Sequence, residues 1–255
     1  MAGSDDILSL APPKADLRVA YGGDANQFVD WRMPKTKGPY AVAICIHGGY
    51  WRAKYDLEYF GHVCAALAAK GVATANVEYR RVGNPGGGWP GTFADIRAAY
   101  QFLLQSAARY EFDVRRVIVL GHSAGGQLAL CLAAREAGVK AVISLAGVVD
   151  LRRAYELHLS NDAVVEFLGG TPTEVEDHYR EADPMELAIR ARQRLVHGSA
   201  DDIVPPSLSK DYVKAKANED ARLLMIPGAG HFEIVDPRSE AWKDVERVVI
   251  AEGTA

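Results

Sequence analysis

The chain has 255 residues, of which 49% are hydrophobic and 24% charged, and its formal net charge is −4. A chain of this length and hydrophobic content buries a large core, and we expect one domain over residues 1–255. Its lysines and arginines are scattered along the chain, so the massed basic surface that nucleic acid requires is missing. Nucleic acid is therefore excluded as a predicted partner.

The N-terminal segment and the cysteines indicate where the protein works. The stretch MAGSDDILSLAPPKADLR has no basic start followed by an apolar run, and no segment approaches the ~20 apolar residues that span a bilayer. Cys45, Cys64 and Cys131 are odd in number and widely spaced, which suits neither a disulfide framework nor a zinc site. We expect a cytoplasmic protein with buried thiols and no membrane partner.

Short β-rich runs alternate with longer helical segments along most of the chain. At the start, LRVAY and QFVDWRMP flank the turn signal GGDAN and predict two antiparallel strands. Further strands are predicted at about 41–46, 72–77, 116–120, 141–146, 193–197 and 222–226. Amphipathic helices are predicted near 55–69, 91–108, 124–137, 206–217 and 238–250.

Fully apolar runs such as RVIVL and AVISLAGVV indicate strands that are buried on both faces. They predict an α/β fold with a mainly parallel sheet of about eight strands and helices on both faces. The longest connection runs from Asp150 to about Arg192 and carries short helical signals in DAVVEFL and PTEVEDHYR. We expect a small helical insertion, a cap, at about 150–192 over one end of the sheet.

The stretch CIHGGYWR places a histidine, two glycines and two aromatic residues directly after the strand predicted at 41–46. His47 could act as a catalytic base, as a metal ligand or as a structural part of the loop. No cluster of Cys, His and carboxylate residues has metal-ligand spacing around it, so we predict no metal. The remaining alternatives depend on the rest of the chain.

The strongest chemical signal is VIVLGHSAGGQLALCLAA, which contains G-x-S-x-G at residues 121–125. An apolar strand precedes Ser123 and an Ala/Leu-rich helix follows it, which is the setting of a nucleophile elbow. There the hydroxyl stands at the carboxyl edge of the sheet, and the helix N-terminus directs free N–H groups at the reaction centre. The alternative is a glycine-rich turn whose serine only caps the helix.

A serine hydroxyl needs a base to take its proton, and in a sheet of this type the partners follow in the order serine, acid, histidine. His47 precedes Ser123 and is excluded as the base by this order. His197 lies inside a predicted strand end and is set aside. His231 lies in the glycine-rich segment MIPGAGHFEIVDP after the last predicted strand, and we predict it as the base.

The acid is expected just past a strand end, in RLVHGSADDIVPP. The spacing favours Asp201 as the catalytic acid and leaves Asp202 to cap or hydrogen-bond within the turn. The alternative for this pair is an Asx-turn ahead of a proline-started helix.

Four segments in this order, HGGYW, GHSAGG, HGSADDIVP and GAGHFEIV, resemble the α/β-hydrolase superfamily. Within it they resemble the esterase/lipase group related to kynurenine formamidase (arylformamidase), over about residues 16–250. VEYRRVGNPGGGWPGTFADIRAAYQFL is also similar to that group's tyrosine–arginine strand end followed by an Asp-bearing helix. The HGG-aromatic-Trp form is more particular to the formamidase-like branch than the HGGG form of ordinary esterases.

The resemblance implies an oxyanion hole made by the backbone N–H groups of Gly49, Tyr50 and Ala124. Gly48 and Gly49 would let the backbone bend so that these groups face the oxyanion. His47 would brace the loop by side-chain hydrogen bonds. The alternative is an ordinary strand-to-loop turn whose aromatic side chains fill the core.

Serine, acid and base together predict a serine hydrolase that forms an acyl-enzyme on Ser123 and needs no cofactor. We predict a small-molecule substrate, either a small carboxylic ester or an aryl-formamide as in kynurenine formamidase. The enzymatic alternatives are a general short-chain carboxylesterase, a lipase-like enzyme or a thioesterase. A hydrolase fold reused as a small-molecule binder is the non-enzymatic alternative, and a binder has no need of all three groups.

Five aromatic residues are candidates for lining the substrate pocket: Tyr50, Trp51, Trp89, Phe167 and Phe232. Each of them, taken singly, is more often a core residue than a ligand contact. The sequence leaves open which ester or amide is used and whether the chain forms a homo-oligomer.

Overall fold

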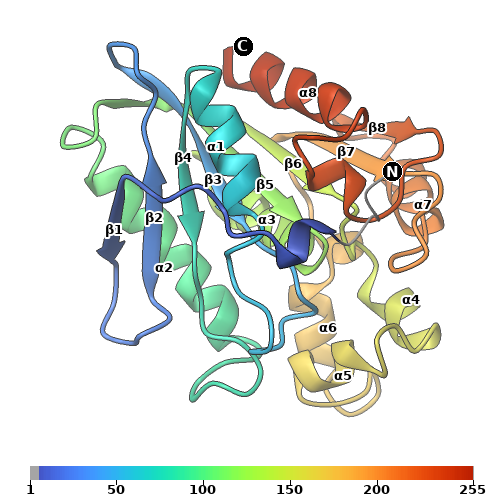
Figure 1. The fold of residues 1–255 in the computed structure, drawn as a ribbon. Coiled ribbons are helices and arrows are strands. Elements are labelled where there is room, and N and C mark those ends of the chain that lie inside the picture. The colour runs from blue at the N-terminus through green and yellow to red at the C-terminus, as the bar shows by residue number, and fades with distance from the viewer. Residues whose placement is uncertain (1–5, 255) are drawn as a thin grey trace.

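The computed structural model describes residues 6–254 and contains an eight-stranded β-sheet with helices on both faces (Figure 1). The strands are β1 (Leu17–Ala20), β2 (Phe28–Arg32), β3 (Tyr40–Ile46), β4 (Val72–Val77), β5 (Phe112–His122), β6 (Ala141–Leu145), β7 (Arg192–Gly198) and β8 (Ala221–Ile226). Their order across the sheet is β1-β2-β4-β3-β5-β6-β7-β8. β1, β2 and β4 pair antiparallel and the other neighbours pair parallel, which confirms the predicted α/β fold and its initial antiparallel pair.

Helices cover the sheet in two layers. The long helices are α1 (Gly61–Ala69), α2 (Gly91–Gln105), α3 (Ala124–Arg135), α7 (Ser207–Ala215) and α8 (Trp242–Thr254). α1 and α8 pack on one face and α2, α3 and α7 on the other (Figure 1). All seven residues of β3 are buried because both faces of the sheet are covered, as the apolar runs predict.

Shorter helices lie outside these layers. They are α4 (Leu151–Glu156), α5 (Ala163–Leu168) and α6 (Glu176–Ala182), with the 3₁₀ helices η1 (Asp6–Ser9), η2 (Pro184–Glu186) and η3 (Glu233–Val235). α4, α5 and α6 lie between β6 and β7 in the chain and gather near the carboxyl ends of the parallel strands (Figure 1). This is the region where a cap is expected at about 150–192. Its action as a cap, and the single-domain division over residues 1–255, stay predictions.

The helix predicted over 55–69 is wrong in its first part, because α1 begins only at Gly61. The Leu57 N–H donates to the buried Glu78 carboxylate at 3.1 Å, and the Glu58 N–H donates to the Asp56 side chain at 2.9 Å. These two N–H groups therefore bond to side chains in turns and do not take part in a helix. Among residues 6–254, no helix is long and apolar enough to cross a membrane. The first five residues of the N-terminal segment analysed above lie outside the described residues.

Candidate active site

Ser123 stands on the tight turn between β5 and α3, where the G-x-S-x-G pattern places it. Its φ of 55° and ψ of −121° are a strained conformation for a residue other than glycine. A Cβ atom on Gly125 would lie 2.1 Å from the Ile46 carbonyl oxygen, and one on Gly121 would lie 2.1 Å from the Gly125 carbonyl oxygen. Glycine at position 125 therefore lets the turn pack against β3, and glycine at position 121 lets the end of β5 approach the start of α3.

His231, after β8, is held by Asp201, which follows β7. Its Nδ1 lies 2.7 Å from Asp201 Oδ2, and both residues are buried. Because a carboxylate only accepts hydrogen bonds, Nδ1 carries a proton and Nε2 of the neutral ring is left as the basic atom. Burial alone would raise the pKa of the Asp201 carboxyl, but hydrogen bonds from His197 and His231 lower it well below its usual range. Asp201 is therefore ionised.

Asp201, and not Asp202, also makes the hydrogen bonds of its turn. Its Oδ1 accepts the N–H groups of Ile203 at 2.9 Å and Val204 at 2.8 Å. Asp202 is exposed and makes no hydrogen bond or ion pair with any other residue between 6 and 254. The prediction that Asp202 hydrogen-bonds within the turn is wrong, because the inward-facing Asp201 carboxylate reaches those amides first.

His197, which the sequence analysis sets aside, is a second partner of Asp201. Its Nε2 lies 3.2 Å from Asp201 Oδ2 and 2.9 Å from the Val204 carbonyl oxygen, while its Nδ1 lies 2.7 Å from Ser209 Oγ. Carbonyl and carboxylate oxygens only accept, so the His197 Nε2–H points at both. The sequence signal that could have identified His197 was its position four residues before Asp201, at the end of the same strand.

The loop of residues 47–52, which we call the oxyanion loop, presents unused backbone donors near Ser123. Gly49 and Tyr50 have φ values of 108° and 50°. Within the described chain their N–H groups donate to no acceptor, and neither does the N–H of Ala124 at the start of α3. Free N–H groups beside a nucleophile are what an oxyanion hole requires. The assignment of Gly49, Tyr50 and Ala124 to that hole stays a prediction.

His47 is fully buried and braces the oxyanion loop by hydrogen bonds, as the resemblance implies. Its Nδ1 lies 2.8 Å from the Gly48 carbonyl oxygen and its Nε2 lies 3.2 Å from Glu78 Oε1. Its ring stacks on Tyr79 with centroids 4.4 Å apart, and the Tyr79 hydroxyl donates to the His47 carbonyl oxygen at 2.8 Å. These contacts fix the first residue of the loop from both backbone and side chain.

Tyr59 and His122 connect the three loops of the site. The Tyr59 hydroxyl oxygen lies 2.7 Å from Gly48 N and 2.8 Å from His122 Nδ1, and His122 Nε2 lies 3.1 Å from the His231 carbonyl oxygen. Burial, aided by His231, holds the pKa of His122 well below its usual range, so the ring is neutral. Its one proton must point at the carbonyl, so Tyr59 donates to His122 and accepts from Gly48.

Ser123 and His231 line one cavity of about 250 Å³. Aromatic rings form much of its wall: Tyr50, Tyr55, Tyr59 and Phe232. Leu8 reaches the cavity from η1, and Ser160 reaches it from the segment between α4 and α5. The structure thus places the predicted nucleophile and the predicted base in one cavity, along with side chains from distant parts of the chain that the sequence analysis did not identify.

Trp51, Trp89 and Phe167 pack on one another and do not line this cavity. The Trp51 ring stacks on Phe167 with centroids 4.4 Å apart and an interplanar angle of 6°, and its Nε1 donates to Gln127 at 3.0 Å. Trp89 and Phe167 pack edge to face, with ring centroids 6.0 Å apart. Of the five aromatic residues predicted for the pocket, Tyr50 and Phe232 are in the cavity wall.

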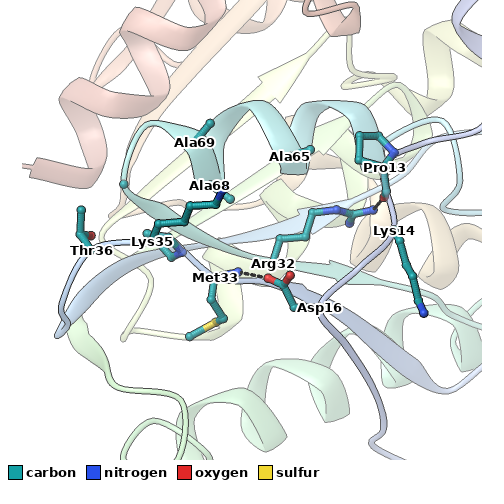
Figure 2. A pocket seen from close by; sticks show the side chains of 12 residues that line it. Pro13, Lys14, Asp16, Arg32, Met33, Lys35, Thr36, Ala65, Ala68 and Ala69 are labelled. Atoms are coloured by element: carbon teal, nitrogen blue, oxygen red, sulfur yellow. Dashed lines mark hydrogen bonds between the residues drawn. The ribbon is translucent and has the colours of Figure 1, made fainter.

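A second, larger hollow of about 370 Å³ lies between α1 and the end of β2 (Figure 2). The Arg32 side chain runs through it and donates to the Pro13 carbonyl oxygen at 2.5 Å. The Asp16 carboxylate accepts the Met33 N–H at 2.7 Å. The described residues that line this hollow include no serine, cysteine or histidine, so the serine–histidine pair of the first cavity has no counterpart there.

The three cysteines, Cys45, Cys64 and Cys131, are free and buried, which confirms the prediction of buried thiols. In the part of the chain that the structure describes, no group of three or more His, Cys, Asp or Glu side chains is placed to hold a metal ion.

Known proteins resemble this chain along most of its length. A probable isoprenylcysteine alpha-carbonyl methylesterase of Arabidopsis thaliana is 25% identical over 85% of this chain and 57% of its own length. A truncated carbohydrate esterase from gut microbiota has a TM-score of 0.81 at 22% identity, covering 96% of this chain and 100% of its own. Esterase B from Lactobacillus rhamnosis has a TM-score of 0.79 at 20% identity, covering 98% and 90%.

These comparisons agree with the architecture described above. The two solved esterases share its fold, a mainly parallel eight-stranded sheet with helices on both faces. The chain spans little more than half of the Arabidopsis relative. The narrower resemblance to arylformamidase stays a prediction. Residues 29–215 match the BD-FAE family, which is most of the chain. The chain therefore has the α/β-hydrolase fold and belongs to the BD-FAE family.

Proposed function

We propose that the chain is a serine esterase that cleaves small esters through an acyl-enzyme on Ser123. The observation that carries the proposal is the shared cavity of Ser123 and His231, in which Asp201 holds the imidazole at 2.7 Å. A nucleophile on a strained turn, a base fixed through Nδ1 and unused N–H donors are the parts that acyl transfer needs. A binding protein would need none of them.

In the proposed reaction Ser123 Oγ attacks the substrate carbonyl carbon while His231 Nε2 takes its proton. The free N–H groups of the oxyanion loop and of α3 stabilise the oxyanion that develops. Ionised Asp201 keeps the imidazole oriented and stabilises its charge. His231 then protonates the leaving group, and water releases the acyl group by the same steps in reverse.

The size of the cavity and the names of the relatives support a small ester as the substrate. A volume of about 250 Å³ lies below the ~300–1,000 Å³ that drug-sized ligands usually occupy. One relative is named a methylesterase, and two structural neighbours are named esterases. Ester cleavage is therefore the activity that we propose first.

An aryl-formamide is the narrower candidate for the same site. The cavity wall carries three tyrosine rings and one phenylalanine ring, which suit an aromatic leaving group. Formyl is the smallest acyl group, so an acyl side crowded by Tyr50 would favour it. In that case the enzyme would resemble a kynurenine formamidase in substrate as well as in sequence motifs.

A panel of p-nitrophenyl acetate, butanoate and octanoate with N-formylkynurenine tests both levels. We expect kcat/KM to fall from acetyl to octanoyl, because overpacking a cramped site costs about 1–3 kcal/mol. An open cleft would instead gain up to about 0.8 kcal/mol for each buried methylene. Activity that peaks at butanoyl or longer, without cleavage of N-formylkynurenine, would leave a general esterase. No turnover of any panel member would overturn the proposed function.

A further inference from the structure

A strained segment between α4 and α5 reaches the catalytic cavity. Four of its residues have positive φ values: His158 (50°), Ser160 (51°), Asn161 (53°) and Asp162 (58°). Such conformations cost of order 1–3 kcal/mol for each residue other than glycine, and they persist only where surrounding contacts fix them. The contacts that hold this segment therefore indicate what it is built to present.

Arg52, at the end of the oxyanion loop, supplies the side-chain contacts to Ser160 and Asn161, while His158 lies 2.7 Å from Asp162 within the segment. Arg52 Nη1 donates to Ser160 Oγ at 3.0 Å, and its Nη2 donates to the Asn161 carbonyl oxygen at 3.3 Å. Its Nε and Nη2 also donate to the two carboxylate oxygens of Glu166 in α5, at 2.7 and 3.0 Å. One planar guanidinium thus bonds to two residues of the segment and to the helix that follows it. It joins the loop that carries the oxyanion donors to the segment that carries Ser160.

The Ser160 hydroxyl keeps an unused proton at the cavity. A guanidinium donates hydrogen bonds and cannot accept them, so Ser160 Oγ accepts from Arg52 and its own hydrogen remains available. Within residues 6–254 that hydrogen has no acceptor. Ser160 lines the same cavity as Ser123 and His231. A hydrogen-bond donor therefore stands ready in the wall of the catalytic cavity.

Two other hydroxyl groups of the wall are already engaged within the protein. The Tyr50 hydroxyl donates to the Ile203 carbonyl oxygen at 2.9 Å. The Tyr59 hydroxyl donates to His122, as described above. Neither has a proton to offer a ligand without breaking a bond, whereas Ser160 does. The Tyr55 hydroxyl also has no hydrogen bond among the described residues, but Tyr55 is exposed and no side chain orients its hydroxyl as Arg52 orients Ser160.

We propose that Ser160 determines specificity by donating a hydrogen bond to a second oxygen of the substrate, outside the reacting ester group. The inference rests on the proposed esterase function. It assigns the site to esters that carry an ether, hydroxyl or carbonyl oxygen in the acyl or alcohol part, in preference to alkyl esters of the same shape. Arg52 is a positioning residue that holds Ser160 in this orientation.

Two pairs of isosteric esters test the inference. The first pair is 2-methoxyethyl acetate and butyl acetate, and the second is the p-nitrophenyl ester of 3-methoxypropanoate and that of pentanoate. In each pair an ether oxygen replaces one methylene. The ratio of kcat/KM for the ether to that for the alkyl ester is measured in the wild type, Ser160→Ala and Ser160→Gly. Comparing this ratio between proteins cancels the intrinsic reactivity of each ester.

We expect the ratio to fall about 3- to 10-fold in both variants for at least one pair, the usual effect of one neutral hydrogen bond. Alanine keeps the strain of a positive φ and glycine relieves it, so a shared loss identifies the hydroxyl rather than the backbone. Arg52→Met should lower the same ratio, because it releases Ser160. Ser207→Ala, an exposed serine at the start of α7, is the matched control and should leave the ratio unchanged.

Two results would overturn the inference or its basis, and they are distinguishable. A change of less than threefold in both Ser160 variants for both pairs, in an active enzyme, would overturn the role of Ser160. A wild type that hydrolyses none of the four esters would overturn the proposed function itself.

Discussion

The cavity that Ser123 and His231 line is smaller than the hollow between α1 and β2, but its lining residues show more backbone strain. The hollow is the larger, at about 370 Å³ against about 250 Å³. Around the cavity, Tyr50, Ser123 and Ser160 hold positive φ values although none is glycine. Around the hollow, the one described lining residue with a positive φ is the glycine Gly71. Backbone strain, rather than volume, therefore distinguishes the region that we propose as the site of chemistry.

The two regions also differ in which polar groups are left without hydrogen-bond partners. At the cavity, backbone N–H groups and the Ser160 hydroxyl remain without acceptors, while His231 is fixed by Asp201 at 2.7 Å. At the hollow, the Asp16 carboxylate and one nitrogen of the Arg32 guanidinium bond to backbone groups of neighbouring segments, while Arg32 Nε and Nη1 have no partner among the described residues (Figure 2). Those bonds hold the N-terminal segment to the sheet. The unpaired groups of the cavity include the donors that we propose for the substrate, whereas the bonds at the hollow join parts of the fold.

Removing the nucleophile should have the largest effect on the cavity. Ser123→Ala is expected to lower kcat for p-nitrophenyl acetate by about 10⁴-fold or more, with the fold intact, because its role is covalent. Ser144→Ala is a matched control, since Ser144 is a buried serine of the adjacent strand β6 whose hydroxyl has no partner among the described residues. Equal turnover by the two variants would contradict the role of Ser123.

Changing the predicted catalytic acid should have the next largest effect on kcat. Asp201→Asn is expected to lower kcat by about 10⁴-fold, because the amide favours the wrong imidazole tautomer. Asp202→Asn, a neighbouring exposed carboxylate, should change kcat by less than about threefold, as surface substitutions usually do. Steady-state kinetics of the two variants on one ester decide the assignment. A reversed ranking would move the acid by one residue.

Changing Tyr59, which connects the loops of the site, should have a smaller effect on kcat. Tyr59→Phe leaves the buried Gly48 N–H and His122 Nδ1 without their partner. We expect kcat to fall about 10- to 100-fold through misplaced donors, with a loss of about 1–3 kcal/mol in the free energy of unfolding. Tyr212→Phe removes a buried hydroxyl bonded to Gln193 outside the cavity and is the control. It should lower stability without lowering kcat.

Low pH should reduce the free energy of unfolding, because Asp201 becomes protonated. The pKa of Asp201 lies below its ordinary value of 3.8 in the folded protein, so its contribution to stability is complete at neutral pH and is lost as pH falls below about 4. Asp201→Asn should therefore show a shallower loss of unfolding free energy between about pH 5 and pH 2 than the wild type. Denaturant melts across this range measure the difference. Identical slopes for the variant and the wild type would contradict it.

The smallest effect is expected at the hollow. Arg32→Met removes a buried guanidinium that has one backbone acceptor and two nitrogens without partners in the described chain. The lost hydrogen bond and the relieved desolvation offset one another, so we expect the free energy of unfolding to change by less than about 1 kcal/mol. kcat should stay within about twofold of the wild type, as for other changes away from the site. A large loss of activity would show that the two regions are coupled.

The sequence predicts the sheet and the positions of Ser123, Asp201 and His231 because each rests on a local pattern. Apolar runs reveal buried strands, and each of the three residues follows one of them within a glycine-rich or proline-marked turn. The parallel order of β3 and β5 to β8 then brings these turns to one edge of the sheet. The order of the strands, rather than the identity of further side chains, therefore determines that these turns meet.

The supporting residues could not be predicted in the same way. Tyr59 lies in a stretch with a helical pattern, where the Leu57 and Glu58 N–H groups bond to side chains instead of forming a helix. Ser160 reaches the cavity through Arg52, which is more than 100 residues away along the chain. The stacking of Trp51 on Phe167 has the same long-range origin. Contacts of this kind leave no periodic pattern in the sequence.

The identity of the nucleophile can be measured directly by peptide mapping after reaction with a fluorophosphonate. We predict a single adduct on Ser123, within the tryptic peptide of residues 117–135, and a loss of esterase activity in proportion to labelling. The Asp201→Asn variant should label far more slowly. An adduct on another residue, or full activity after complete labelling of Ser123, would contradict the catalytic role of the cavity.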